Sequence, residues 1–401
     1  MHKTPNFLFV FSLCVCLFFV YRFSEIYSHS LSLIEKRKGF ETHGVENDGV
    51  NNSFSIACKP SQEKSDILSK DEFSFVTCSS SDFVEQSVNQ NAYLSSDCST
   101  FLPKGHSFSS LPLNFSPPLF DTFMFNGEVD VLLIRLNELQ NVVTRFVVLE
   151  STWSFTKAKK NLLFPQFYHI FSPWFHLIHY VVVDSIPCDL DTTWPTEFFL
   201  RNQLYRGVVE AMNSMGMPAA ARNSALVAIS DVDEIPHELD YFQARTCPGW
   251  LAFAPLKLKL NNFVYRLKWK VADWERGSRI APFVLLRPDS KPATSKVPYT
   301  VDELRMIERR PDKGFFSLQT RGWHFGYFMS ASAIFRKTRG FSHQELKMPS
   351  LEEIENCILV GCWIFGNVSL PVFPFQERTA AFIESLPKFL KTNLNCFSFY
   401  F

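Results

Sequence analysis

Three short apolar runs, each ending at an acidic residue, constrain the fold of this chain more than any other feature. Their length and β-branched content are typical of buried strands, and the stretches between them are compatible with helices. Strands that alternate with helices favour a mostly parallel sheet with helices on both faces. Since ligands bind beyond the carboxyl ends of such strands, we expect the acids to share one rim of a ligand site. The runs are RFVVLES (145–151), LIHYVVVD (177–184) and ALVAIS (225–230), and the acids are Glu150, Asp184 and Asp231.

The segments around these runs complete an α/β pattern. Apolar residues recur at helical spacing in 129–140 and 197–212, which predicts two helices. The segment EIPHELDYF predicts a short helix with Pro236 near its first turn. Further along, we predict a hairpin in 250–270 that turns at Asn261 and Asn262, a strand in 317–328 and a helix in 330–346.

The first 115 residues differ from the rest in composition and in the periodicity of their apolar residues. Residues 7–21 carry no charge and are followed by RFSEIYSHS, which lacks the small residues of a signal-peptidase site. We therefore predict an uncleaved transmembrane signal anchor at 7–21 behind a cytosolic tail at 1–6. Residues 22–115 are rich in Ser, Asn, Asp and Glu without a sustained period, which predicts a poorly ordered stem. The α/β pattern then occupies one catalytic domain at 116–401.

Charge and cysteine content narrow the function classes. The 401 residues include 40 Lys and Arg against 40 Asp and Glu, so no basic surplus attracts nucleic acid. We expect no nucleic-acid partner. Two of the ten cysteines lie in the apolar run, and the remaining eight permit disulfides without revealing their pairing. The absence of a C-x-x-C pair disfavours structural zinc.

The segment ALVAISDVDEIPHELD (225–240) concentrates carboxylates at the end of an apolar run. Asp231 and Asp233 are two apart, so on an extended segment both carboxylates face one hard cation, while Glu234 faces elsewhere. A calcium loop of EF-hand type needs Gly at its sixth position and Glu at its twelfth, where this chain has Pro236 and Phe242. A glycosidase pair, with carboxyls about 5 to 10 Å apart across a sugar, fits such close neighbours poorly.

The third interpretation is the D-x-D motif of enzymes that transfer a sugar from a nucleotide. Breaking a sugar–phosphate bond leaves negative charge on a diphosphate, and a divalent cation held by carboxylates stabilises that charge. Oxygen ligands suit Mn²⁺ or Mg²⁺ better than zinc. A D-x-D alone is a weak signal, but its position at the end of an apolar run strengthens it.

Six sequence blocks in this order resemble glycosyltransferase family 17, the β-1,4-mannosyl-glycoprotein 4-β-N-acetylglucosaminyltransferase family. The resemblance covers residues 118–345, and the first block and the DVDEIP block are its most specific parts. Family members often carry a cysteine after G-W-H, where this chain has Phe325. The blocks are FMFNGEVDVLLIRLNELQNVVTRFVVLESTWSFT, LRNQLYRGV, ALVAISDVDEIP, LKLNNFVYRLKW, RGWHFGYF and GFSHQE.

The resemblance implies a single-pass type II membrane enzyme of the Golgi with a luminal domain of GT-A-like fold. It implies inverting transfer of N-acetylglucosamine from UDP-GlcNAc to a mannose of glycoprotein N-glycans, with Mn²⁺ or Mg²⁺ as the cofactor. Two alternatives stay open: a transferase of the same fold with another donor or acceptor, and a catalytically inactive glycan-binding relative. The acceptor, the linkage and the oligomeric state do not follow from the sequence.

The site residues we predict fall into three groups. Each also has a structural explanation, since acids favour a helix N-terminus, an exposed helical Arg is ordinarily solvated, and aromatic residues belong first to the core. The metal ligands are Asp231, Asp233 and, through its family block, His324; the donor-binding residues are Glu128, Asp130, Glu150, Arg201, Asn202 and Trp323; the candidates for the catalytic base are Glu234, His343 and Glu345.

Overall fold

The computed structural model describes residue 98 and residues 116–190, 193–274, 278–290, 299–307, 317–366 and 380–401. The predicted cytosolic tail, the signal anchor and nearly all of the predicted stem lie outside these residues. Among the described residues, none of the helices combines the length and the apolar character that crossing a membrane requires.

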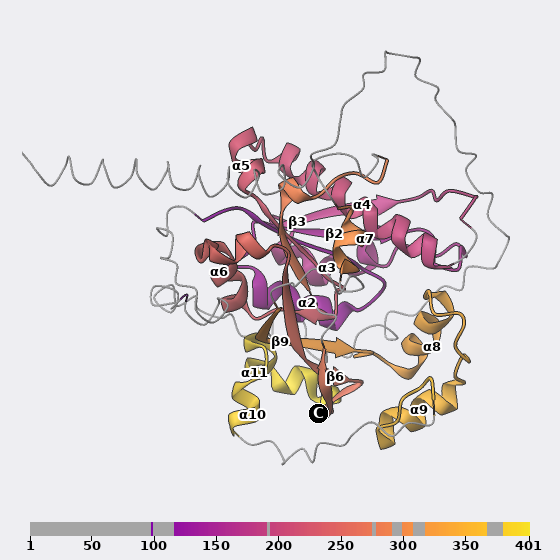
Figure 1. The fold of residues 1–401 in the computed structure, drawn as a ribbon. Coiled ribbons are helices and arrows are strands. Elements are labelled where there is room, and N and C mark those ends of the chain that lie inside the picture. Colours follow the sequence, from indigo (N-terminus) through magenta and orange to yellow (C-terminus); the bar gives the residue numbers. More distant parts are fainter. Residues whose placement is uncertain are drawn as a thin grey trace, which may run out of the picture. The chain divides into compact units, whose positions relative to one another are not determined.

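The three predicted apolar runs form strands in the parallel part of one sheet, which confirms the predicted parallel pairing. Their order in the sheet is β3-β2-β1-β4, and every neighbouring pair in this part is parallel. The carboxyl ends of these strands therefore meet at one edge (Figure 1). The strands are β1 (Leu119–Met124), β2 (Arg145–Ser151), β3 (Ile178–Val183) and β4 (Leu226–Ile229).

Two helices cover opposite faces of this parallel part, because successive strand residues point to opposite sides. Helix α2 (Val129–Leu139) packs in one core cluster with Phe146 and Val148 of β2. Helix α4 (Thr193–Ser214) packs in another with Val147 and Leu149. Gly207 lets α4 approach closely, since a Cβ there would lie 2.6 Å from Val147 Cγ1.

Beyond β4 the sheet is mixed. Strand β8 (Arg279–Pro282) is antiparallel to β4, and β6 (Leu256–Val264) is antiparallel to β8. Strand β9 (Ser317–Gly326) runs parallel to β6, and the short β5 (Glu234–Ile235) is antiparallel to β9. The predicted mixed α/β class is confirmed, with parallel pairing concentrated where the acids follow the strands.

Two sequence-based boundaries were wrong. The hairpin of β6 and β7 (Arg266–Trp274) turns at Tyr265, which has φ 62°, whereas Asn261 and Asn262 lie inside β6. Their amides are used in the sheet region, where Asn261 donates to the Gly322 carbonyl and Asn262 contacts His324. The helix predicted near Pro236 begins only at α6 (Glu238–Thr246), because the residues before the proline pair with β9.

The remaining elements pack around both the parallel and the mixed part of the sheet. Cys98, from the predicted stem, is buried and disulfide-bonded to Cys247, and Cys357 is bonded to Cys362. Cys188 and Cys396 each form a disulfide bond as well. The other helices are α3 (Tyr168–Phe171), α5 (Ala219–Ser224), α7 (Val301–Arg305), α8 (Ala331–Gly340), α9 (Leu351–Val360), α10 (Ala380–Glu384) and α11 (Lys388–Thr392), with 3-10 turns η5 (Phe164–Phe167), η6 (Ser172–Trp174), η7 (Pro248–Phe253), η8 (Phe283–Leu285) and η10 (Leu394–Tyr400).

Candidate active site

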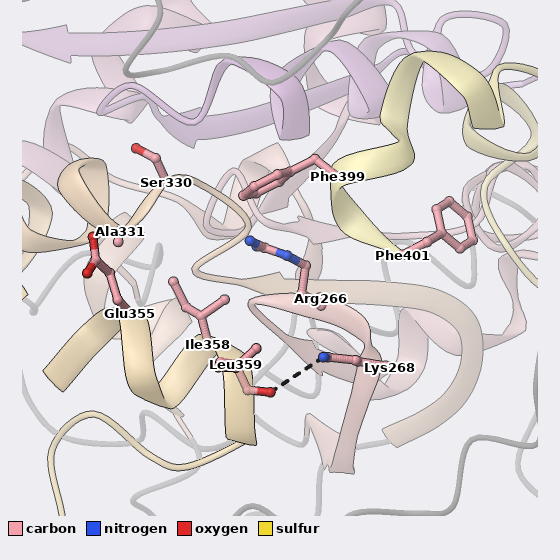
Figure 2. Close-up of a pocket in the computed structure, with 9 residues that line it drawn as sticks. All are labelled: Arg266, Lys268, Ser330, Ala331, Glu355, Ile358, Leu359, Phe399 and Phe401. Carbon is pink, nitrogen blue, oxygen red and sulfur yellow. Dashed lines mark hydrogen bonds between the residues drawn. The ribbon is translucent and has the colours of Figure 1, made fainter. Parts of the chain in front are cut away.

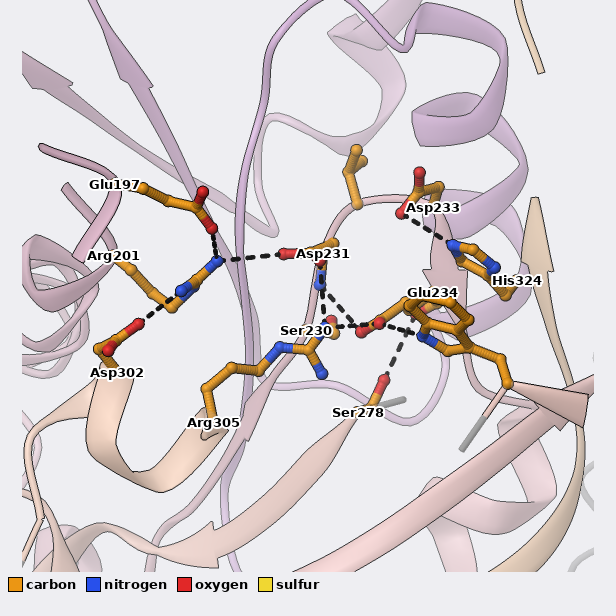
Figure 3. Close-up of polar contacts among 12 residues, drawn as sticks. Glu197, Arg201, Ser230, Asp231, Asp233, Glu234, Ser278, Asp302, Arg305 and His324 are labelled. Carbon is orange, nitrogen blue, oxygen red and sulfur yellow. Dashed lines mark hydrogen bonds and ion pairs between the residues drawn. The ribbon is translucent and has the colours of Figure 1, made fainter. Parts of the chain in front are cut away.

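The segment between β4 and β5 makes a turn, and the turn separates the two aspartates. We expected an extended segment with both carboxylates facing one cation, and this geometry was wrong. The Asp231 carboxylate lies 3.1 Å from Arg305 and 3.9 Å from Arg201. The Asp233 carboxylate lies 3.8 Å from both His324 and Lys337. Figure 3 shows the two side chains directed to opposite sides of the turn.

A fully buried arginine, Arg135 of α2, holds this turn from the inside. Its guanidinium pairs with Asp121 of β1 at 2.6 Å and donates to the Ser230 hydroxyl at 2.5 Å. A buried charge is tolerated only when it is paired and hydrogen-bonded, and both conditions are met here. The same guanidinium also donates to the carbonyl oxygens of Asp231 (3.1 Å), Val232 (3.2 Å) and Glu234 (2.7 Å).

On one side of the turn lies an arginine cluster, which we define as Asp231, Arg201, Arg305, Glu197 and Asp302. Arg201 pairs with Asp302 at 2.5 Å and with Glu197. The Asp231 side chain is 43% exposed. Desolvation would raise the pKa of Asp231, but Arg305 and Arg201 outweigh it and lower that pKa to about 2. Asp231 is therefore an ionised carboxylate whose charge is already compensated.

The predicted donor residues Arg201 and Asn202 both belong to this side of the turn. The side-chain oxygen Oδ1 of Asn202 accepts a hydrogen bond of 2.9 Å from the backbone N–H of Asp302, so Asn202 fixes the start of α7. Both side chains are buried, so Arg201 is not an exposed, solvated helical arginine.

On the other side lies a histidine cluster, which we define as Asp233, His324, Lys337 and Glu128. Lys337 of α8 pairs with Glu128 at 2.7 Å and approaches Asp233 at 3.8 Å. His324 of β9 stacks on Trp274 with the ring centroids 4.1 Å apart. The predicted metal ligands Asp233 and His324 are thus brought together with the predicted donor residue Glu128.

The hydrogen bond of His324 defines which of its nitrogens is protonated. Nδ1 lies 2.7 Å from the side-chain oxygen of Asn262, so Nδ1 carries the proton and donates it. Nε2 then presents a lone pair to the Asp233 carboxylate at 3.8 Å. Burial lowers the pKa of His324 to about 4, which keeps the imidazole neutral near pH 7.

The charge of Asp233 is less well compensated than that of Asp231, because its neighbour Lys337 lies closer to Glu128. Burial raises its pKa to about 6, and the negative charges of Asp231 and Glu128 add to the rise against the opposing effect of Lys337. An ionised Asp233 opposite a neutral imidazole places two electron-pair donors face to face. Such an arrangement is stabilised by a proton or by a metal cation between them.

The donor set fits a divalent cation that shares its coordination with the substrate. Among the described residues, no three His, Cys, Asp or Glu side chains are grouped as a metal site. Mg²⁺ is commonly bound through one or two carboxylates together with substrate phosphates, and imidazole and carboxylate are both ligands for first-row metals. Asp233 and His324 are side chains of these two types, whereas the Asp231 carboxylate faces arginines.

Glu234, which we predicted as a candidate base, is fully buried, and its carboxylate is hydrogen-bonded within the protein. Its carboxylate accepts from Trp274 at 2.6 Å, from Arg305 at 2.5 Å and from the backbone of Asp231 at 3.1 Å. These contacts favour a role in positioning the turn over contact with a sugar hydroxyl.

Three predicted donor residues make structural contacts elsewhere in the core. Glu150 accepts from the backbone of Leu163 at 2.6 Å and from the Tyr180 hydroxyl at 2.7 Å, which fixes the loop after β2. Asp130 accepts from the Tyr400 hydroxyl at 2.7 Å. Trp323 donates to the Ser385 carbonyl at 2.9 Å and, as the neighbour of His324 on β9, points to the other face of the sheet.

His343 and Glu345 lie together on an exposed loop after α8, with 2.7 Å between Nδ1 and the carboxylate. Ser342 in the same loop bonds to Glu197, and its carbonyl accepts from Thr193 at 2.5 Å. The loop therefore borders the arginine cluster, and both predicted base candidates remain accessible there.

Several residues of the site were not predicted from the sequence. Arg135 had a detectable signal, because it is the one basic residue in the apolar helix segment 129–140. Lys337 and Arg305 had none, since each lies in a short helix beside other charged residues. Asn262 was noted only as a turn residue.

A comparison with family models matches part of this chain to a known family. The model described as glycosyltransferase family 17 matches residues 91–283, which include the parallel strands, α2, α4 and the turn that carries Asp231 and Asp233. His324 and Lys337 lie beyond the matched region. A comparison with curated proteins found no match. Residues 91–283 therefore carry a glycosyltransferase family 17 domain, in agreement with the resemblance of the sequence blocks, and the protein is a glycosyltransferase.

Proposed function

We propose that the protein moves N-acetylglucosamine from UDP-GlcNAc to a mannose of glycoprotein N-glycans in an inverting, cation-dependent reaction. The family match supports sugar transfer. The donor and the acceptor class are those implied by the resemblance of the sequence blocks to this family. The observation that carries the cation dependence is the neutral His324 facing the ionisable Asp233 at 3.8 Å. The parallel strands that lead into this site also support a GT-A-like fold.

Asp233 and His324 are the residues that would hold the cation, Mn²⁺ or Mg²⁺. When bound, such a cation stabilises the negative charge of the departing diphosphate. Asn262 keeps the His324 lone pair directed at this position, and Trp274 fixes the plane of the ring.

Lys337 supplies a second positive charge beside the same space. Its ammonium lies 3.8 Å from Asp233 and is held by Glu128 at 2.7 Å. An ammonium placed there donates charge-assisted hydrogen bonds to diphosphate oxygens. Asp231, ionised and partly exposed, accepts hydrogen bonds from hydroxyl groups of the donor, while the arginine cluster fixes its position.

The acceptor hydroxyl needs a base within hydrogen-bond reach. The exposed pair of His343 and Glu345 fits this need better than the buried Glu234. Glu345 accepts from the imidazole, and this hydrogen bond lowers the pKa of Glu345, which keeps its carboxylate ionised. We assign the base to this pair.

The compartment that suits this reaction is the Golgi lumen, with the domain attached through the predicted anchor at residues 7–21. The disulfides Cys98–Cys247 and Cys357–Cys362 support an oxidising compartment.

A donor screen with the purified full-length protein tests the proposal. We expect the fastest transfer or hydrolysis with UDP-GlcNAc among UDP-GlcNAc, UDP-galactose and GDP-mannose, and loss of turnover in EDTA that Mn²⁺ restores. Preference for another donor would favour the alternative transferase. Binding of UDP without turnover of any donor would favour the inactive relative, and equal rates in EDTA and Mn²⁺ would reject the cation.

A further inference from the structure

A second site lies at the opposite end of α8 from Lys337. It is a pocket of about 520 Å³ between the start of β7, the N-terminus of α8, helix α9 and η10. This volume falls in the range of about 300 to 1,000 Å³ that is typical of small-ligand pockets. Figure 2 shows Arg266 in the middle of the pocket, between Ile358 and Phe399.

Arg266 has positive charge but no carboxylate partner within the described residues. Its guanidinium lies 3.6 Å from the Phe399 ring centroid and donates to the carbonyl of Tyr265 at 2.8 Å. Burial lowers the pKa of Arg266 to about 10, so it stays charged at neutral pH. A partly desolvated guanidinium with spare donors favours an anionic ligand.

Lys268 adds a second positive charge on the same side of β7, since residues two apart on a strand share a face. Its ammonium donates to the Leu359 carbonyl at 3.5 Å. Glu355 is the acidic residue among those that line the pocket, so the two basic side chains outnumber it. The walls include apolar Ile358 and Leu359.

We propose that this pocket binds an acidic sugar of the acceptor glycan, a pyranose that carries a carboxylate. Arg266 and Lys268 take the carboxylate, and Ile358 and Leu359 contact the C–H face of the ring. That the ligand is a sugar rests on the proposed function. From Ala331 in the pocket to Lys337 in the histidine cluster, α8 advances about 9 Å at its usual rise, a distance that an oligosaccharide spans.

Binding of two matched sugars to the full-length protein tests this inference. Methyl β-D-glucuronide and methyl β-D-glucoside differ only in the carboxylate, and saturation-transfer NMR measures both affinities without donor or cation. We expect the glucuronide to bind at least about tenfold more tightly, as charge-assisted hydrogen bonds predict. Arg266→Gln should remove about tenfold of this affinity, and Lys268→Gln a smaller factor.

The matched control is Lys347→Gln, which removes a lysine that is 87% exposed outside the pocket and should leave both affinities unchanged. Thermal unfolding checks each variant, and if Arg266→Gln unfolds, Lys268→Gln decides alone. Equal binding of the two sugars, or unchanged glucuronide affinity in the pocket variants, would overturn the proposal. Competition by inorganic sulfate at the same affinity as glucuronide would also overturn it, because a plain anion site has no need of the ring.

The two proposals fail separately. Glucuronide binding that depends on Arg266, in a protein without N-acetylglucosamine transfer, would reject the proposed function and keep the acidic-sugar pocket. Transfer to N-glycans by a protein that does not distinguish the two sugars would reject the pocket alone.

Discussion

Asp231 lies between two guanidinium groups, whereas Asp233, two residues later, lies between a neutral imidazole and an ammonium. The pKa of Asp231 is lowered to about 2 and that of Asp233 is raised to about 6. Two identical side chains therefore differ in the charge that they leave uncompensated. The D-x-D motif therefore does not present two equivalent carboxylates: Asp231 pairs with two arginines, whereas Asp233 lies 3.8 Å from a neutral imidazole and 3.8 Å from an ammonium that is itself paired with Glu128.

The turn that separates the aspartates is the physical source of this difference. Arg135 binds the carbonyl oxygens of Asp231 and Val232 from below, so the backbone cannot extend at this position. The two clusters then come from different parts of the chain: Arg201 and Arg305 from α4 and α7, His324 and Lys337 from β9 and α8.

Neutralising each aspartate tests the difference between the two carboxylates most directly. Asp233→Asn should lower kcat/KM by about 1,000-fold or more, since a cation on a diphosphate contributes several kcal/mol to the transition state. Asp231→Asn should cost about 10- to 100-fold, because it removes hydrogen bonds to the donor and leaves the cation ligands in place. Steady-state kinetics and Mn²⁺ titration measure both. Equal losses of Mn²⁺ affinity in the two variants would show that the aspartates act as one clamp.

Removing an arginine should destabilise the fold on the Asp231 side. Arg305→Met leaves the buried Glu234 without its cation and should lower the free energy of unfolding by about 3 to 4 kcal/mol, as expected for a broken buried pair. Arg206→Met is the control, since its pair with Glu210 is exposed and contributes under about 1 kcal/mol. Urea unfolding near neutral pH measures both. A loss for Arg305→Met no larger than the control would mean that the cluster is not needed to hold the turn.

The fold could be predicted from the sequence where apolar, β-branched runs mark the strands. The apolar runs at β2 and β4 are buried inside the sheet, as their composition predicts, and the acid after β4 marked the correct edge of the sheet. The similar run at β3 forms an edge strand instead and leaves Val182 exposed. The hairpin turn failed because Asn261 and Asn262 have the composition of a turn, but their amides are used inside the sheet, while Tyr265 makes the turn with φ 62°.

The site was predictable only in part, because its two halves depend on long-range contacts. Asp233, His324 and Glu128 were named from motifs, and the structure brings them together. Lys337 pairs with Glu128 from 209 positions away in the sequence, and no local pattern marks it. Glu150 and Asp130 were predicted at the donor, yet hydrogen bonds to Tyr180 and Tyr400 use their charges inside the core.

The pH dependence of stability should have opposite signs for the two aspartates. The raised pKa of Asp233 means that the folded state holds its proton more tightly than the unfolded chain. This stabilisation is fully present below about pH 4 and is lost as the pH rises through about 6, which corresponds to about 3 kcal/mol. The lowered pKa of Asp231 gives stability that is present above about pH 4 and lost as the pH falls through about 2.

Asn variants test these signs in the absence of a cation. Asp233→Asn should match the wild type near pH 4 and exceed its free energy of unfolding near pH 8, whereas Asp231→Asn should be less stable than the wild type near pH 8. Urea unfolding at both pH values measures the difference. An Asp233→Asn protein that is less stable than the wild type near pH 8 would contradict the raised pKa of the Asp233 carboxyl group.

The smallest effect should sharpen the role of Lys337 in the histidine cluster. Lys337→Met removes the ammonium beside Asp233 and should weaken binding of UDP by about 10- to 100-fold, as for loss of a charge-assisted hydrogen bond. Uridine lacks the diphosphate, so its affinity should stay unchanged, and Lys337→Arg should retain part of the UDP affinity because it keeps the charge. Calorimetric titration of both ligands separates the cases. Equal weakening of uridine and UDP would assign Lys337 to holding Glu128 and the fold, and the ligand contacts of this side would then reduce to Asp233 and His324.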